Sequence, residues 1–132
     1  MKEIYGFSKN IGIKDIGFQD EHYHVELTIE PFHRNGHGIL HGGVISTLLD
    51  AAMARATFNS LDEGVIAGVT LEMQTNFLKA KEAGIVTAIG IMIKKTKNTA
   101  FVEGKLVDEE GTLLAKSSAT MMLSYQKKLQ SL

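Results

Sequence analysis

The segment from His41 to Asn59, HGGVISTLLDAAMARATFN, decides the fold of this chain. From Val44 onward it is rich in Ala and Leu, and its two ionisable groups are Asp50 and Arg55. A helix that is apolar around most of its circumference belongs in the interior of a domain. We therefore expect residues 44–59 to form a long central helix that the rest of the chain covers.

Extended segments lie on both sides of this helix. Residues 22–30, HYHVELTIE, place apolar side chains at odd positions and polar ones at even positions, which is typical of a half-buried strand. Pro31 ends that strand. The β-rich segments that follow the helix are residues 65–77, 84–93, 99–107 and 113–125. A polar connection at 94–98 and a turn at 108–111, DEEG, join the last three of them.

These elements predict one α+β domain over residues 1–132, in which an antiparallel sheet of about five strands covers one long helix. Residues 1–20 are ambiguous, and the expected elements there are a short helix and an edge segment packed on the outside. The length suits a single domain with a core of its own.

The composition excludes several classes of protein. Lys and Arg number 14 against 15 Asp and Glu, and this balance argues against a nucleic-acid partner, which requires a basic surplus. The absence of cysteine excludes disulfides, cysteine nucleophiles and thiolate metal sites. The start of the chain shows no signal peptide, and the sequence contains no apolar run that could span a membrane. We therefore expect a cytoplasmic protein without a membrane partner.

Glycine is in excess, with 13 residues where average usage predicts about nine. Four of them fall in residues 36–43, directly before the helix. Such a cluster indicates a loop that delivers a ligand group to a helix N-terminus. The alternative is a flexible loop that closes a turn. The other nine glycines are at background frequency, so we expect no special role for them.

The helix carries two groups that could take part in catalysis, one at its start and one two turns later. The unpaired Gly42 N–H lies at the positive end of the helix dipole and can stabilise an oxyanion. The carboxylate of Asp50 can act as a base or a nucleophile. The alternative for Asp50, a solvated acid on an outer face, is weakened by the small residues that share its side of the helix, which are Gly43, Ser46, Thr47, Met53, Ala54 and Thr57.

The spacing of these groups has a consequence for assembly. Eight residues at ~1.5 Å per residue separate Gly42 from Asp50 by roughly 12 Å. Both groups must lie within ~3–3.5 Å of the reacting atoms. One helix cannot meet this condition, whereas two antiparallel copies related by a two-fold axis can. An active site that uses both groups therefore requires a homodimer.

The run Asn35-x-x-Gly38-x-x-His41-Gly42-Gly43, followed by Leu48-x-Asp50, resembles the signature of the hotdog-fold acyl-CoA thioesterases of the phenylacetate-pathway, or PaaI-like, type. The resemblance covers about residues 20–125. It implies hydrolysis of an acyl-CoA to a free acid and coenzyme A by a homodimer or homotetramer. It further implies that no cofactor is bound, because coenzyme A is part of the substrate.

The resemblance also implies roles for individual residues. Gly42 would polarise the thioester carbonyl through its N–H, and Asn35 would help to hold that carbonyl or the substrate. Asp50 of the partner subunit would activate water or attack directly. Thr70 would orient the water or the carboxylate. His41 belongs to the signature and is expected to shape the turn into the helix by hydrogen bonding.

Coenzyme A binding is expected at the motif residue Gly43 and at two strand ends. The resemblance places the phosphates near Phe77, Lys79 and Lys81 and near a second group of residues, namely Lys94, Lys97, Asn98 and Thr99. Family members often have Gly then Arg where this chain has Thr96 then Lys97. The alternative is that these lysines serve solubility alone.

The histidines have metal-like spacings, which are His33, His37 and His41 at every fourth position and the pair His22-x-His24. Pro31 and the glycines argue against a helix for the first set, so we expect no metal site. Three rival functions stay open. They are an acyl-thioester-binding hotdog protein without turnover, a hotdog hydratase or dehydratase, and a structural dimer module. The sequence determines neither the acyl group nor whether Asp50 acts as nucleophile or base.

Overall fold

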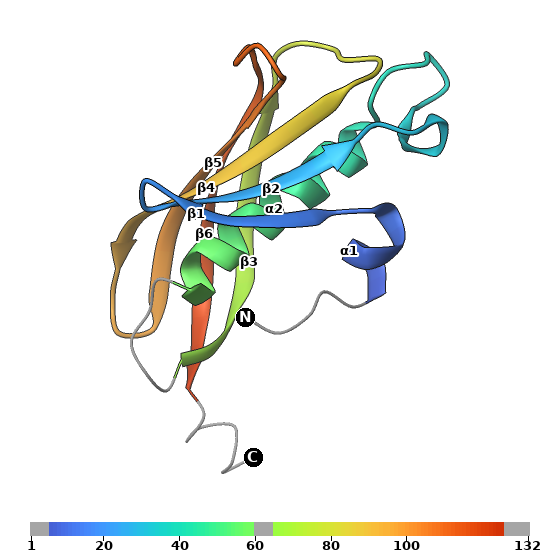
Figure 1. Ribbon diagram of the computed structural model, residues 1–132. Coiled ribbons are helices and arrows are strands. Elements are labelled where there is room, and N and C mark those ends of the chain that lie inside the picture. Colours follow the sequence, from blue (N-terminus) through green and yellow to red (C-terminus); the bar gives the residue numbers. More distant parts are fainter. Residues whose placement is uncertain (1–5, 60–64, 126–132) are drawn as a thin grey trace.

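The computed structural model describes residues 6–59 and 65–125 and shows a curved sheet around one long helix (Figure 1). The elements in chain order are α1 (Gly6–Ile11), β1 (Lys14–Gln19), β2 (His22–Thr28), the short 3-10 helix η1 (Pro31–His33), α2 (Gly42–Asn59), β3 (Val65–Phe77), β4 (Ile85–Lys95), β5 (Thr99–Val107) and β6 (Leu113–Tyr125).

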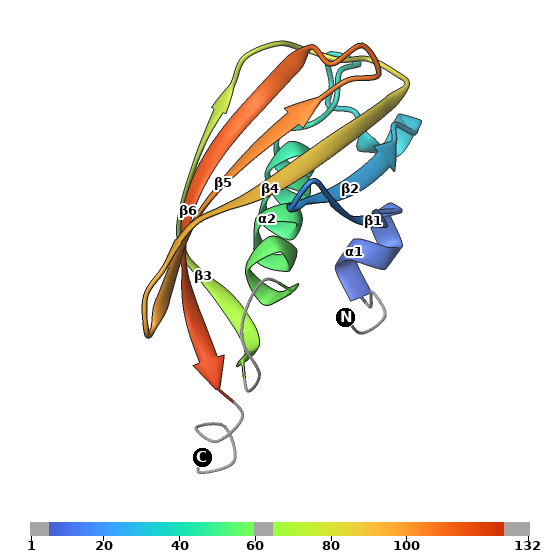
Figure 2. The ribbon, with the colours of Figure 1, turned by 60° about the vertical axis from the view of Figure 1, so that its left-hand side comes forward.

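The sheet has the strand order β1-β2-β4-β5-β6-β3, and all neighbouring strands are antiparallel. Figure 2 shows that it curls around α2 and leaves its other face open. The short strand β1 and the 13-residue strand β3 form the two edges. The predicted α+β class is therefore confirmed, with six strands in place of about five.

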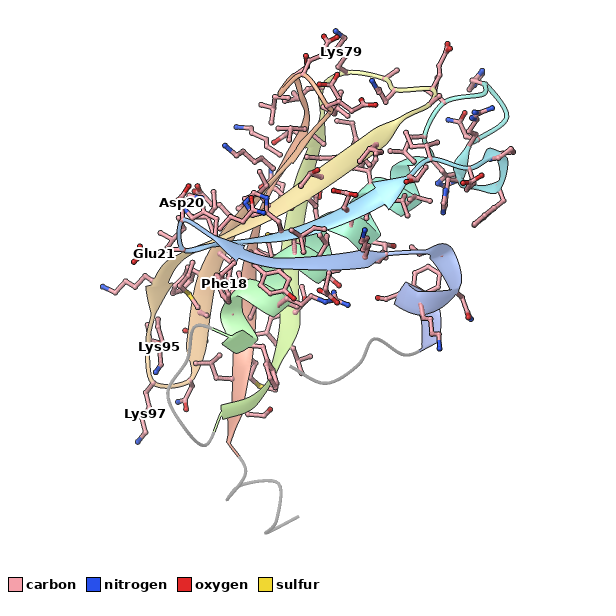
Figure 3. All side chains as sticks on the ribbon, in the orientation of Figure 1. Phe18, Asp20, Glu21, Lys79, Lys95 and Lys97 are labelled. Carbon is pink, nitrogen blue, oxygen red and sulfur yellow. The ribbon has the colours of Figure 1, made fainter. Side chains whose placement is uncertain are left out.

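The additional strand, β1, comes from the ambiguous residues at the start of the chain, where a short helix and an edge segment were expected. Both are present, as α1 and β1. A two-residue turn at Asp20 and Glu21, both with positive φ (52° and 68°), joins β1 to β2 and lies at the tip of that hairpin in Figure 3. Two positive φ angles are the mark of a type I′ turn.

Helix α2 packs its aliphatic face into the sheet as predicted. Burial of a Leu side chain stabilises a fold by about 1.5–3 kcal/mol, and Leu48 and Leu49 are both fully buried. The other buried members of that face are Ile45, Ala52 and Ala56. On the opposite side, Asp50 and Ser46 are half-buried, so this side of the helix is covered less by its own chain.

Two residues on the Asp50 side of α2, Met53 and Thr57, are nevertheless fully buried. The sheet reaches further around the helix than a flat layer would, because glycines face these side chains. A Cβ at Gly104 would lie 3.1 Å from the Met53 side chain, and one at Gly68 would lie 3.2 Å from the Thr57 methyl group.

Among the glycines of the described strands, Gly90 in β4 lies nearest to the backbone of the helix. A Cβ built on Gly90 would collide with the backbone carbonyl of Ala52 and lie 3.0 Å from the amide nitrogen of Met53. The interpretation of the glycines outside residues 36–43 as background was therefore wrong. Gly68, Gly90 and Gly104 are needed where the strands contact the helix.

Arg55, the cation on the apolar helix, is 7% exposed and finds its partner on the edge strand. Its Nε lies 2.9 Å from Asp15 Oδ1, and the Tyr23 hydroxyl donates to the same oxygen at 2.7 Å. Burial, together with the hydrogen bond to Asp15, raises the pKa of Tyr23 to about 12. This cluster fastens β1 and β2 to the C-terminal half of α2.

Replacement of Gly90 by Ala should destabilise the fold, because the new methyl group meets helix backbone that cannot rotate away. We expect Gly90→Ala to lower the free energy of unfolding by about 1–3 kcal/mol in urea denaturation. Gly36→Ala is the matched control, since a Cβ there meets nothing within 4 Å. A Gly90→Ala protein as stable as the control would contradict the direct contact between α2 and β4.

Candidate functional site

The glycine-rich loop before α2 is closed on itself. Arg34 and Leu40 form an isolated antiparallel bridge at its base. Inside the loop, Asn35 N–H donates to Ile39 O at 2.8 Å and Gly38 N–H donates to Asn35 O at 3.0 Å. Gly38 has a φ of 78°, which a residue with a Cβ rarely adopts. The loop therefore has a defined turn rather than a flexible closure.

The side chain of Asn35 supports this turn from within. Its Oδ1 accepts the N–H of His37 at 2.9 Å and the N–H of Ile39 at 3.3 Å. Because both neighbours are donors, the amide oxygen must face the loop and the NH2 group must face away from it. Within residues 6–59 and 65–125, that NH2 group has no partner. Asn35 thus holds the loop and keeps a free donor.

The segment between β3 and β4 holds the same loop from outside. Lys81 O accepts the N–H of Leu40 at 2.8 Å, and Glu82 O accepts Arg34 Nε at 2.8 Å. The Lys81 ammonium lies 3.1 Å from Glu109 Oε1 and 3.6 Å from Asp108 Oδ2. The turn between β5 and β6 therefore anchors Lys81, and Lys81 anchors the loop.

Helix α2 begins with three of its first four amides occupied. His41 is the N-cap, with its Nδ1 accepting the N–H of Gly43 at 2.8 Å. His41 O accepts the amides of Val44 at 3.0 Å and Ile45 at 3.1 Å. In the described part of the chain, this leaves Gly42 as the one amide of the first turn without a partner. A carbonyl oxygen can approach it at the positive end of the helix.

Small residues give access to this amide. A Cβ at Gly43 would lie 3.0 Å from His41 Nδ1, so the absence of a side chain there lets His41 fold back as a cap. A Cβ at Gly42 would lie 3.5 Å from the ring of Phe77, which is 56% exposed. The predicted substrate-binding residue Phe77 thus forms one wall beside the free amide.

Asp50 lies two turns further along α2 and faces the edge strand. The hydroxyl of Thr70 in β3 donates to Asp50 Oδ1 at 2.6 Å. A short bond from a hydroxyl to a carboxylate fixes the orientation of that carboxylate. The structure therefore brings Thr70 and Asp50 together, and both side chains are half-buried.

None of the three hollows described within residues 6–59 and 65–125 is lined by Gly42 or Asp50. Their eight-residue separation on one continuous helix is roughly 12 Å. Hollows of about 480, 220 and 190 Å³ have other linings. The first lies on the outer face of the sheet, between Lys105, Lys116 and Gln74. Both candidate groups lie beside β3, Asp50 next to Thr70 and Gly42 next to Phe77.

The predicted coenzyme A ligands are divided between two ends of the molecule. Figure 3 shows Lys79 at one end and Lys97 at the other. Lys94, near the end of β4, and Asn98, in the turn between β4 and β5, are both exposed near Lys97. In that turn the hydroxyl of Thr99 lies 2.6 Å from that of Thr96. At the first end, Lys81 differs from Lys79 because two carboxylates already pair with it.

The histidines with metal-like spacing form no metal-binding cluster among the described residues. Among the described residues, no cluster of three or more His, Cys, Asp or Glu side chains can hold a metal ion. The two ring nitrogens of His33 lie within hydrogen-bond distance of backbone groups, at 2.9 Å from Glu30 N and 2.6 Å from Ile11 O. Burial, followed by the nearby His22 and Lys105, lowers the pKa of His24.

Sequence reasoning missed the contacts that hold the loop. The ion pairs of Lys81 join residues that are 27 and 28 positions apart in the sequence. No local sequence pattern predicts an ion pair over such a separation. The ring of His33 had a readable signal, since a polar side chain three residues after a cap position often reaches back to the cap amide.

The sequence profile of the thioesterase superfamily matches residues 37–115. A 1,4-dihydroxy-2-naphthoyl-CoA hydrolase of Listeria monocytogenes is 31% identical over 93% of this chain and 99% of its own length. Within residues 6–59 and 65–125, no helix has the length and apolar character needed to cross a bilayer.

Solved structures give the same answer for the fold. A thioesterase of Haemophilus influenzae superposes with a TM-score of 0.84 at 24% identity, over 89% of this chain and 82% of that one. A variant of the phenylacetic acid degradation protein PaaI of Thermus thermophilus superposes with a TM-score of 0.78 at 25% identity, over 88% and 96% of the two chains. The hotdog fold that the sequence indicated is therefore confirmed.

The anchor of Lys81 has a pH dependence with a defined sign. Hydrogen bonds from the amides of Glu109 itself and Ile85, and then the Lys81 ammonium, lower the pKa of Glu109. Its contribution to stability is thus present above the unfolded pKa of about 4.3 and is lost as pH falls through the lower folded value. The hydrogen bond to Glu109 raises the pKa of Lys81. The contribution of the Lys81 ammonium to stability is therefore lost only at alkaline pH.

We therefore expect Glu109→Gln to be less stable than wild type near pH 7 and to approach it below about pH 4, as the wild-type carboxylate becomes protonated. Urea midpoints between pH 3 and pH 7 measure this difference. Glu110→Gln is the matched control, because it removes the neighbouring carboxylate, which pairs with no cation among residues 6–59 and 65–125. Equal pH profiles for the two variants would contradict the anchoring of Lys81 by Glu109.

Proposed function

The chain belongs to the thioesterase superfamily, and we propose that it hydrolyses acyl-CoA thioesters to a free acid and coenzyme A. The observation that carries this proposal is the pairing of an open amide with an oriented carboxylate on one helix. Gly42 offers the unpartnered N–H, and Asp50 is held by Thr70. Thioester hydrolysis needs both an oxyanion donor and a base or nucleophile.

The active site is completed by a second copy of the chain. At roughly 12 Å, Gly42 and Asp50 of one helix cannot reach the same thioester carbon. Both lie against β3, Asp50 through Thr70 and Gly42 through the ring of Phe77. A second copy placed along β3 with its chain antiparallel brings the Gly42 amide of one subunit to the Asp50 carboxylate of the other.

The exposed edge of β3 supports this assembly. The strand order leaves one side of β3 without a neighbouring strand among the described residues. A long unpaired edge is a template for a further strand. Its apolar side chains are exposed in the single chain, with Val69 at 48% and Leu71 at 57%. Burial of these side chains against a twin would stabilise a homodimer.

The two groups of coenzyme A ligands support the same arrangement. Lys79 and Lys97 lie at opposite ends of one chain (Figure 3), so the phosphates of one coenzyme A cannot contact both within a subunit. An antiparallel twin places one end of a chain beside the opposite end of its partner. Lysines suit phosphate as mobile point charges. One coenzyme A would then be held between the two subunits.

The reaction follows from this geometry. The Gly42 N–H donates to the thioester oxygen and stabilises the negative charge that forms on it during attack. Asp50 of the partner either takes a proton from water, which adds to the carbonyl carbon, or attacks that carbon itself. The C–S bond then breaks, and the coenzyme A thiolate gains a proton, which Asp50 returns on the first route and solvent supplies on the second. On the second route, water then hydrolyses the anhydride between the acyl group and Asp50 and releases the free acid. Single turnover in ¹⁸O-water places label in Asp50 only on the second route.

The acyl group is proposed from the similar enzyme of Listeria monocytogenes, whose name states an aromatic acyl-CoA. Its similarity extends over 93% of this chain. We therefore rank bicyclic aromatic acyl-CoA first among candidate substrates, ahead of straight chains. The exposed ring of Phe77 beside Gly42 offers an aromatic surface for such a group.

The test is thiol release from a panel of acyl-CoA substrates, from short and long straight chains to phenyl and naphthoyl groups. We expect Asp50→Asn to lower kcat at least about 1,000-fold on every substrate that the wild type hydrolyses. The variant should keep the oligomeric state of the wild type in size-exclusion chromatography, because Asn can still accept from Thr70. Full activity in Asp50→Asn would exclude the assigned role of Asp50.

A mixing experiment tests the shared site. Gly42→Pro removes the amide hydrogen while Pro is tolerated at the first position of a helix. Gly42→Ala is the control, since it keeps the amide and adds only a methyl group 3.5 Å from Phe77. Asp50→Asn and Gly42→Pro should each be inactive alone. Refolded together in equal amounts, they should recover about a quarter of wild-type activity, because half of the dimers carry one intact site. Hybrid dimers without activity would contradict a site shared between subunits.

A further inference from the structure

His33 is a buried histidine that the proposed reaction does not use. It ends η1, two residues before Asn35, and is 1% exposed. Its Nδ1 lies 2.9 Å from the amide nitrogen of Glu30, and its Nε2 lies 2.6 Å from the carbonyl oxygen of Ile11. An amide can only donate, so Nδ1 must be the acceptor and Nε2 must carry the proton. The ring is therefore neutral, with both nitrogens engaged.

These two bonds fix the position of the residue from opposite sides. The bond from Glu30 closes the single turn of η1, which carries the chain from β2 into the glycine-rich loop. The bond to Ile11 ties that turn to the end of α1, across 22 residues of sequence. Since both ring nitrogens are occupied by backbone groups, His33 can neither contact substrate nor bind metal without breaking the turn.

The backbone of the same residue reaches the site. The carbonyl of His33 accepts the N–H of His41 at 2.9 Å. His41 is the N-cap of α2, and its peptide group carries the Gly42 nitrogen. The path from the buried ring to the open amide thus runs through one residue and one hydrogen bond. The His41 N–H lies in the peptide before His41 and the Gly42 N–H in the peptide after it, so a shift of the His33 carbonyl would move His41 and thereby re-aim the Gly42 N–H.

We propose that His33 is a positioning residue for the oxyanion site, whose imidazole fixes the carbonyl that holds His41 and thereby aims the Gly42 amide at the thioester oxygen. The role rests on the proposed function, since it concerns the amide assigned there. It requires an acceptor and a donor on opposite edges of one small ring, which neutral imidazole supplies. Asn reproduces the acceptor near the Nδ1 position, and Gln reproduces the donor near Nε2.

The test compares His33→Phe, which removes both ring bonds at similar volume, with His33→Asn and with a control. The control is Val102→Ala in the central strand β5, a buried position where the change removes core packing and no bond to the loop. Four quantities are measured for each homodimer. They are the melting temperature, kcat and KM on the best substrate, and the hydrogen exchange rate of the His41 amide.

We expect His33→Phe to lower kcat at least about tenfold with KM changed less than about threefold, because orientation in the transition state is lost rather than binding. Exchange of the His41 amide should rise at least about tenfold in the same variant. Val102→Ala should keep kcat within about twofold of wild type, although its melting temperature is similar to that of His33→Phe. His33→Asn should recover part of kcat, since it retains the bond from Glu30.

Equal loss of kcat in Val102→Ala at the same melting temperature would overturn the proposal, because it would make the effect one of stability. Wild-type kcat in a folded His33→Phe would overturn it directly. Should His33→Phe not fold, an unchanged kcat in His33→Gln, which lacks the bond from Glu30, would overturn it. Should the wild type hydrolyse no thioester, the proposed function fails, and unchanged His41 exchange in His33→Phe then excludes the positioning role by itself.

Discussion

The contact between the backbone of α2 and strand β4 at Gly90 sets the geometry of the whole domain. With no Cβ at Gly90, the sheet lies directly on the helix near Ala52. The strands can then curl far enough to bury Met53 and Thr57, which lie well around the circumference from the aliphatic face. The strip of α2 with Asp50 lies at the margin of this cover, beside the edge strand β3, and is only half-buried. The position of the site is therefore a consequence of how closely helix and sheet approach.

Much of this fold could be predicted from local periodicity, because each central element has a strong pattern of its own. The alternation in residues 22–30 and the apolar run after Gly43 are independent of the rest of the chain. Strand β1 had no comparable signal. It has six residues, its pairing is interrupted between Asp15 and Gly17, and its turn is Asp20-Glu21 rather than a glycine pair. The inner-face glycines were missed because their role depends on which residues lie opposite in space.

The candidate site likewise has a part that the sequence predicts and a part that it does not. The geometry of a single helix is enough to single out Gly42 and Asp50, and the structure adds the hydroxyl of Thr70 at 2.6 Å from Asp50. The contacts that hold the loop could not be predicted, because they join distant segments. Lys81 meets the turn between β5 and β6, and His33 meets the end of α1. Supporting contacts of this kind follow from the tertiary fold rather than from sequence spacing.

The loop leaves one amide open by satisfying the others. His41 alone accepts from Gly43 through its ring and from Val44 and Ile45 through its carbonyl. Gly42 is half-buried in the single chain, so water can still reach its N–H. A second subunit laid along β3 would exclude that water, and an unsatisfied buried donor costs about 1–3 kcal/mol. In the proposed reaction, the carbonyl of a bound thioester would remove this cost, and an oxyanion would accept more strongly still. The proposed dimer would therefore both complete the site and increase the preference of the Gly42 amide for the transition state.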